Sequence, residues 1–231
     1  MIKIPSKIDV HMLGTTHNPK VWEKHFEYVS DTKSKSALGR VLARCATTKN
    51  SHLSREFVFS IAEEDVREGL IASVIWGFPK GSGPGGNWKR LADAFAKSRE
   101  YADAIEKLKR APFVSALAGL CSLNQIQNGV GFATTSKMAY FANVEFQEGR
   151  ALIYDRNVML AIKDGLWADR FDGTRSGIGM NQHFYSKGVS TYASFIEEAE
   201  KACRQIGCDA DQIETGLFLA RANAKSNWTF S

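Results

Sequence analysis

The chain has 231 residues, of which 44% are hydrophobic and 24% are charged, and its formal net charge is +5. This composition is typical of a globular protein, and we expect one or two compact helical lobes. No apolar run approaches the roughly eighteen residues that cross a bilayer, and the N-terminal sequence MIKIPSKIDV lacks the apolar core of a signal peptide, so we expect a cytoplasmic protein that does not associate with membranes.

Hydrophobic residues recur with the helical period over most of the chain, whereas the alternation typical of strands is scarce. The pattern predicts helices over residues 19–29, 36–46, 62–76, 88–96, 101–110, 112–127, 135–143, 156–165, 190–206 and 211–222. The sequence therefore predicts an all-α protein.

The excess of positive charge lies in the N-terminal region. Between residues 31 and 55 a single acidic residue, Asp31, is followed by the basic residues Lys33, Lys35, Arg40, Arg44, Lys49 and Arg55. Such a cluster suits contact with phosphates. A solvated basic helix has the same composition and is the alternative interpretation.

The clearest loop is the sequence GFPKGSGPGG at residues 77–86, and a lobe boundary is expected near residues 77–87. It fits neither a Walker-A motif nor a dinucleotide-binding fingerprint. It is either a plain connector or a loop beside a binding face, with Lys80, Lys89 and Arg90 available to contact phosphates.

Two later helices carry terminal signals. Pro112 suits the first turn of the helix predicted over residues 112–127, in which Phe113 and Leu117 are expected to face inward. Asp211 is a favoured N-cap, and Glu214 three residues later completes a pattern like a capping box.

Residues 129–155 hold the most informative pattern. Gly129 and Gly131 allow a tight turn before a helix that Thr134, Thr135 or Ser136 is expected to cap, with Lys137 in its first turn. There the partly positive helix end favours a neutral amine, which is a nucleophile. An apolar run leads to Asp155 at the start of the next helix, where a carboxylate can stabilise a developing positive charge.

The run GVGFATTSKMAY at residues 129–140, followed by LIYD at residues 152–155, resembles the helix-hairpin-helix DNA glycosylases, which share a hairpin, a catalytic lysine and an aspartate. The chain departs from the family pattern in three places. Gln127 and Asn128 replace a Leu-Pro pair, residues 133–136 add length before the lysine, and Asn157 stands where the family often has histidine. The nearest subgroup is the 8-oxoguanine branch, which uses a lysine and no iron–sulfur cluster.

The resemblance implies two helical lobes flanking a DNA-binding cleft, in a single unit over residues 1–231 with its catalytic core at residues 112–165. It also implies that Lys137 attacks the sugar and that Asp155 assists, so that a damaged or modified base leaves through a Schiff base and strand cleavage can follow. The implied DNA contacts are Gly129, Gly131, Thr134, Thr135, Ser136 and Arg156.

An extruded base needs aromatic and hydrogen-bonding walls. The candidates for this base pocket are Phe132, Tyr154, Gln182, His183 and Trp228, with Tyr185 as a further aromatic residue. The expected partner is double-stranded DNA, and the sequence does not specify an oligomeric state.

Other chemistries lack their motifs. The cysteines form no C-x-x-C pair and the histidines form no H-E-x-x-H, so we expect neither a metal site nor another cofactor. Three alternatives stay open: a helix-hairpin-helix module that binds DNA without catalysis, a glycosylase-like protein that acts on modified foreign DNA, and a helical interaction protein. In the first and third, Lys137 is a surface lysine and Asp155 only a helix cap.

Overall fold

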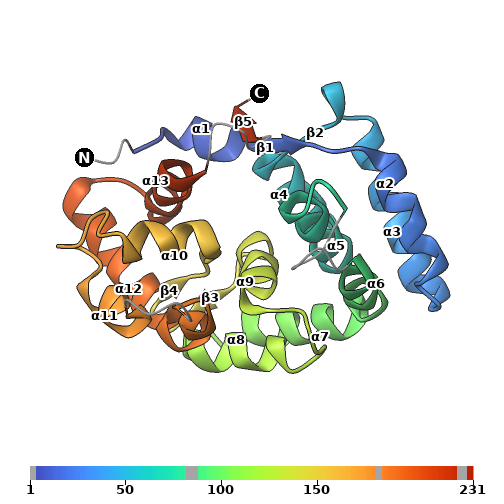
Figure 1. Cartoon of the computed structure of the whole chain (residues 1–231). Helices are drawn as coiled ribbons and strands as arrows, with labels where there is room; N and C mark the ends of the chain where they lie inside the picture. Colours follow the sequence, from blue (N-terminus) through green and yellow to red (C-terminus); the bar gives the residue numbers. More distant parts are fainter. Residues whose placement is uncertain (1–3, 82–87, 180–183, 223–227, 231) are drawn as a thin grey trace.

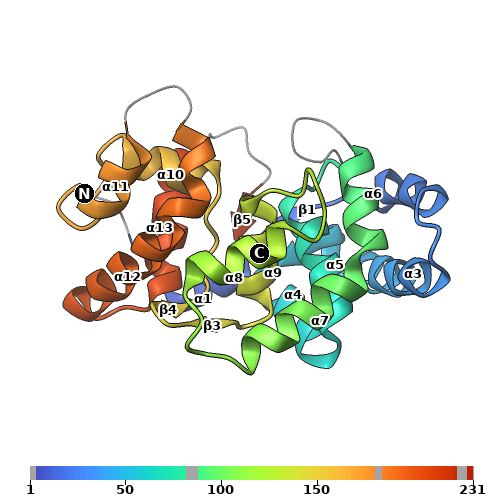
Figure 2. The same ribbon diagram turned by 90° about the horizontal axis from the view of Figure 1, so that it is seen from below.

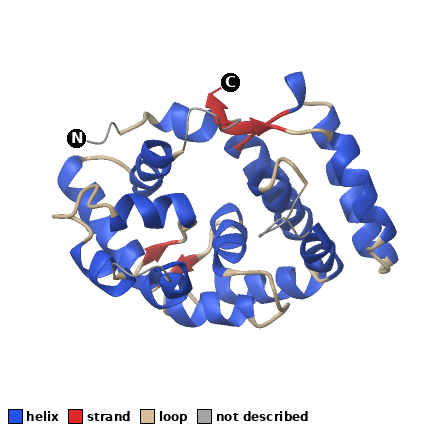
Figure 3. Cartoon of the chain, in the orientation of Figure 1, coloured by secondary structure: helices blue, strands red, loops and turns tan. Residues whose placement is uncertain are grey.

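The computed structural model of the chain describes residues 4–81, 88–179, 184–222 and 228–230. In this part of the chain, helices form two groups on either side of a central helix, α9 (Phe132–Phe141) (Figure 1). The strands are short and few (Figure 3). The predicted all-α class is therefore confirmed.

The N-terminal group contains most of the chain before residue 110. Its helices are α2 (Pro19–Glu23), α3 (Thr32–Ala46), α4 (Arg55–Glu64), α5 (Val66–Gly77), α6 (Trp88–Ala96) and α7 (Ser98–Lys109), with 3₁₀ turns at Lys24–Glu27 and Lys49–Ser51. Helix α8 (Ala116–Asn124) leads from this group into α9. Seen from below in Figure 2, α9 lies between the two groups.

The C-terminal group follows α9 through a small hairpin of β3 (Glu145–Phe146) and β4 (Gly149–Arg150). Its helices are α10 (Arg156–Lys163), α11 (Asp172–Ile178), α12 (Gly188–Ile206) and α13 (Ala210–Arg221), with a 3₁₀ turn at Phe184–Lys187. Helix α1 (Lys7–Met12) contacts both α4 and α13, so it joins the two groups (Figure 1).

A three-stranded antiparallel sheet closes the same edge of the molecule. Its central strand β1 (Leu13–Thr16) pairs with β2 (His52–Ser54) on one side and with β5 (Trp228–Phe230) on the other. A Cβ on Gly14 would lie 2.1 Å from the Leu53 carbonyl oxygen, so this close approach requires glycine. The sequence did not predict the sheet, because strands of three or four residues are too short to show alternation.

The helix predicted over residues 62–76 is two helices, with the break at Asp65. The backbone of Asp65 is extended, and its side chain caps α5 by accepting a hydrogen bond of 3.0 Å from the Glu68 N–H. Helices α4 and α5 then fold back closely, because Gly69 leaves no room for a Cβ beside Ala62. The local cap therefore prevails over the continuous hydrophobic period.

The predicted starts of α8 and α13 are wrong. Helix α8 begins at Ala116, so Phe113 precedes it and is 90% exposed, and Leu117 is 40% exposed rather than inward. Helix α13 is capped by Asp209, whose N–H donates to the Gln212 side chain at 2.9 Å, and not by Asp211 with Glu214. Because the cap lies two residues earlier than predicted, Glu214 does not cap the helix, and its side chain is buried in the core.

Buried apolar side chains from both groups form one connected core. It reaches from Leu38 on α3 through Phe141 on α9 to Ile196 on α12. The predicted lobe boundary near residues 77–87 lies largely outside the described residues. Within the described ranges, none of the helices combines the length and apolar character needed to span a membrane.

Candidate active site

The connection between α8 and α9 turns at Gly129, whose φ is 88°. The backbone conformation favours glycine, and a Cβ there would lie 3.0 Å from Nε of Arg90 on α6, so the turn and this side chain lie in close contact. Gly131 is the N-cap of α9, and a Cβ on it would meet no atom within 4 Å. The space in front of the α9 N-terminus is therefore open.

Helix α9 begins three residues earlier than predicted. The N–H groups of Thr134 and Thr135 both donate to the Gly131 carbonyl, so Gly131 caps the helix and the predicted capping by Thr134, Thr135 or Ser136 is wrong. Phe132, the first residue of the helix, is buried, and its ring contacts those of Tyr154 and Tyr185. Lys137 consequently lies in the second turn rather than the first.

Thr135 and Ser136 are engaged inside the protein. The Thr135 hydroxyl donates to Asn124 Oδ1 on α8 at 2.7 Å, and Ser136 Oγ accepts a hydrogen bond of 3.2 Å from the Tyr154 N–H. Both side chains are fully buried. They join α9 to its neighbours, so the structure gives them positions between elements rather than on a surface that meets DNA.

The Ser136–Tyr154 bond brings together the residues that follow each partner, Lys137 and Asp155. Lys137 Nζ lies 3.6 Å from Asp155 Oδ2 and donates to the Ala133 carbonyl at 3.1 Å. The aliphatic stem of the lysine packs on Gly77, where a Cβ would be 2.9 Å from Lys137 Cδ. The amine is thus held beside the carboxylate by contacts from α5 and α9.

Asp155 is also the N-cap of α10. Its Oδ1 accepts hydrogen bonds from the N–H groups of Asn157 at 2.9 Å and Val158 at 3.2 Å, which fixes the carboxylate plane. The other oxygen, Oδ2, faces Lys137. The cap and the ion pair therefore coexist on one side chain.

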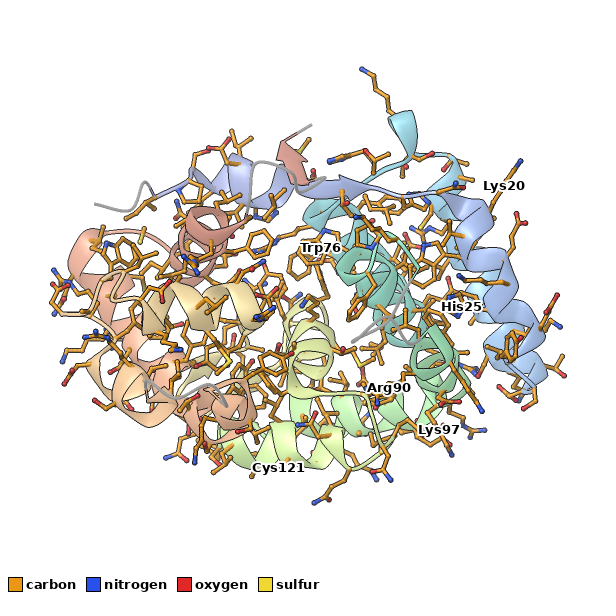
Figure 4. The ribbon with its side chains drawn as sticks, viewed as in Figure 1. Lys20, His25, Trp76, Arg90, Lys97 and Cys121 are labelled. Carbon is orange, nitrogen blue, oxygen red and sulfur yellow. The ribbon has the colours of Figure 1, made fainter. Side chains whose placement is uncertain are left out.

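Lys137 and Asp155 open into one cavity of about 560 Å³, a size common for small-molecule sites. Its walls come from α5 and α6, from the turn before α9, and from the C-terminal group: Gly77, Phe78, Arg90, Gly129, Val130, Gly131, Ala133, Thr134, Lys137, Asp155, Arg156, Asn157 and Tyr185. Figure 4 shows Arg90 on the N-terminal side of this region. Arg90 and Arg156 are both exposed and give the cavity positive charge.

Gly129, Gly131, Thr134 and Arg156, four of the predicted DNA contacts, line this cavity together with Lys137. The sequence did not single out Phe78, because a residue just beyond a helix end carries no periodic signal. It noted Asn157 only as a departure from the family. Tyr185 lines the cavity, and burial, with a smaller contribution from the Asp155 carboxylate, raises the pKa of its hydroxyl to about 12.

The predicted base-pocket residues lie elsewhere or outside the described residues. Tyr154 is fully buried, with its hydroxyl 3.0 Å from Thr191 Oγ1 and its ring stacked on Phe195. It therefore belongs to the core, and Phe132 packs beside it rather than lining the cavity. Gln182, His183 and the Trp228 side chain fall outside the described residues.

Three of the six basic residues of the N-terminal cluster are paired within the protein. Arg40 and Arg44 on α3 pair with Glu68 and Glu64, and Arg55 is buried. This leaves fewer free cations there than the sequence suggested. Within the described parts of the chain, no three His, Cys, Asp or Glu side chains gather as metal ligands would.

A family model described as "Putative 8-oxoguanine DNA glycosylase OGG-like protein" matches residues 9–218. The matched region contains both groups of helices, the α8–α9 turn and the cavity that holds Lys137 and Asp155. No curated protein and no solved structure matches the chain.

Proposed function

Because the chain belongs to the OGG-like family of 8-oxoguanine DNA glycosylase proteins, we propose that it removes a damaged or modified base from double-stranded DNA, with 8-oxoguanine as the first candidate. The observation that supports this most directly is the position of Lys137 Nζ, 3.6 Å from Asp155 Oδ2 in one open cavity. An amine and a carboxylate are the two groups that this chemistry needs side by side.

In the proposed reaction, Asp155 Oδ2 accepts a proton from the Lys137 amine, and the neutral nitrogen attacks the sugar C1′. The N–C1′ bond forms as the N-glycosidic bond breaks, and the base leaves with the bonding electron pair. The departing base takes the proton held by Asp155, and the carboxylate that this restores stabilises the positive charge that develops on the sugar. The C1′–O4′ bond of the adduct then breaks as a proton moves from the nitrogen to O4′, which gives a Schiff base from which β-elimination can cleave the strand.

The cavity mouth suits a nucleotide. Arg90 and Arg156 come from opposite groups of helices and can contact phosphates on either side of an extruded residue. Between them, Gly131 leaves space for a backbone to approach the α9 N-terminus. Tyr185 and Asn157 offer a ring and an amide to the base itself.

Borohydride trapping tests the lysine directly. Wild-type protein, Lys137→Gln and Lys109→Gln are incubated with duplexes that carry 8-oxoguanine or an abasic site, and covalent adducts are resolved by electrophoresis. Lys109 lies near the end of α7, away from the cavity, and serves as a matched control. We expect adducts with wild type and Lys109→Gln and none with Lys137→Gln.

The other outcomes identify the alternatives. If no lesion yields an adduct but duplex binding is salt-sensitive, the chain is a DNA-binding module without catalysis. If adducts form only with modified bases of foreign DNA, the substrate assignment changes and the lysine chemistry stands. If no DNA binds at low salt, the glycosylase assignment fails.

A further inference from the structure

Arg55 is buried at the centre of the molecule. It is the first residue of α4, and its side chain is 1% exposed. Its guanidinium donates to Tyr140 on α9 at 3.1 Å and to Thr215 on α13 at 2.9 Å, and Nη2 lies 2.8 Å from Oε2 of Glu214, which is 0% exposed. One side chain therefore joins α4, α9 and α13.

Packing does not explain the choice of these residues. Taking two charges out of water is costly, and apolar residues of similar volume often serve stability equally well. Aromatic rings already surround the guanidinium, since its Cζ lies 5.4 Å from the Trp76 ring centroid and 5.1 Å from that of Tyr140. A buried charge adds directional hydrogen bonds, which here connect α4 to α9 and α13.

This connection lies next to the candidate catalytic pair. Tyr140 follows Lys137 by one turn of α9, and Trp76, in the middle of the molecule in Figure 4, precedes the Gly77 that packs on the lysine stem. On the other side, Glu214 belongs to α13, which packs on α10, the helix capped by Asp155. Each partner of Arg55 therefore lies on the helix that carries Lys137 or on the helix that packs against the one capped by Asp155.

We propose that Arg55 and Glu214 are positioning residues for the Lys137–Asp155 pair. Arg55 fixes α9 through Tyr140 and fixes α13 through Glu214 and Thr215, and these helices carry or support the amine and the carboxylate. This role rests on the proposed function as far as catalysis is concerned. The coupling between the two pairs of charges exists whether or not DNA is the substrate.

Glu214 also couples electrostatically to the site. Burial raises its pKa to about 7, Arg55 opposes this shift, and the carboxylates of Asp155 and Asp211 add to it. Burial likewise raises the pKa of the Tyr140 hydroxyl, which faces the same guanidinium and stays protonated. Above pH 7 the two charges of the Arg55–Glu214 pair balance. Below it, Glu214 takes up a proton and no longer balances the positive charge of Arg55.

Two variants separate charge from packing. Glu214→Gln keeps the shape and removes the charge, but it leaves Arg55 buried without a counter-charge and is expected to lower the Tm. The double variant Arg55→Met with Glu214→Gln removes both charges and keeps the fold testable. The matched control is Arg44→Met with Glu64→Gln, which removes a pair between α3 and α4 with bonds of 2.8 Å and 3.0 Å, remote from the cavity.

The first readout needs no DNA. The protein is treated with formaldehyde and cyanoborohydride between about pH 6 and about pH 9. Peptide mass spectrometry then measures the rate at which Lys137 is dimethylated. In folded Glu214→Gln the Arg55 connection between α9 and α13 is weakened, so the Lys137 amine is held less closely against Asp155, and we expect methylation about threefold faster than in wild type above pH 7 and no difference below about pH 6. The control should match wild type throughout.

The second readout is single-turnover cleavage of an abasic duplex. The double variant should bind DNA as wild type does and react at least about tenfold more slowly, because the amine and carboxylate are less well aligned. A folded Glu214→Gln with the wild-type methylation profile, together with a double variant of wild-type rate, would overturn the positioning role. If wild type cleaves no DNA, the proposed function fails, and the methylation profile still decides the coupling between the two pairs.

Discussion

Asp155 uses its two carboxylate oxygens for different partners. Oδ1 accepts both N–H groups at the start of α10, whereas Oδ2 lies 3.6 Å from Lys137 Nζ. A cap restricts the rotation of the side chain, so the oxygen that faces the lysine is held in place without a separate support. The sequence offered a catalytic carboxylate and a helix cap as alternatives for this residue, and the geometry allows both.

Asparagine and alanine at position 155 should separate these two uses. Asparagine is an equally good N-cap, so Asp155→Asn should keep the cap of α10 and lower the single-turnover rate by roughly 10²-fold or more, through loss of the charge that faces the sugar. Asp155→Ala should show the same loss of rate and should be about 1 kcal/mol less stable than Asp155→Asn, because it also loses the cap. Urea unfolding and abasic-site cleavage measure the two effects.

The N-cap of α5 provides the control for this series. Asp65 caps that helix through the Glu68 N–H and lies outside the cavity. Asp65→Asn and Asp65→Ala should reproduce the stability difference and leave cleavage unchanged. A rate for Asp155→Asn equal to that of wild type would remove the carboxylate from the mechanism.

At the scale of elements, α9 is the helix on which the site depends. Ser136 connects it to the segment before Asp155, Lys137 faces the cavity, and Tyr140 meets Arg55. Three residues of one helix therefore serve alignment, chemistry and support. This explains why every residue from 134 to 141 is buried although the helix has polar residues in its first half.

Removing the Ser136 hydroxyl should disturb the catalytic pair without touching it. Ser136→Ala leaves the buried Tyr154 N–H without its acceptor, so we expect a loss of about 1–3 kcal/mol in unfolding free energy and a slower cleavage step. Ser73→Ala is the control, because the hydroxyl of this buried serine donates to the Leu70 carbonyl of its own helix. It should leave cleavage unchanged, and a wild-type rate in Ser136→Ala would show that the bond does not align the pair.

Helices were predicted from sequence better than their ends. The segments around α6 and α12 were found closely, because each presents one continuous apolar face. The starts of α5, α8, α9 and α13 were misplaced, since caps at Asp65, Ser115, Gly131 and Asp209 depend on which neighbouring side chains are buried. Local signals compete there, and tertiary packing selects among them.

At the scale of the whole molecule, charge gathers at the cavity from both groups of helices. Arg90 comes from α6 and Arg156 from the start of α10, at positions far apart in sequence. The cations of α3, by contrast, are partly neutralised by pairs with α4 and α5. The face that suits a polyanion is therefore the cavity mouth rather than the basic N-terminal segment.

Salt dependence of DNA binding tests this distribution. Arg90→Gln should weaken binding to a lesion-containing duplex and reduce the slope of log affinity against log salt by about one, as expected for one lost phosphate contact. Arg110→Gln removes an exposed arginine beside α7, distant from the cavity, and should change neither. Fluorescence anisotropy at several salt concentrations gives both quantities. Equal slopes for wild type and Arg90→Gln would exclude a phosphate contact by this residue.

The sequence alone determined the helical class, the family resemblance, and the two residues on which the proposed chemistry rests. These follow from local information: hydrophobic period, a glycine turn, and a lysine and an aspartate with characteristic neighbours. Tertiary structure decided what surrounds them. The Arg90 side chain beside Gly129, the burial of Tyr154 and the contact between Arg55 and Glu214 join segments tens to more than a hundred residues apart. Such contacts depend on the packing of whole helices, and no local pattern specifies them.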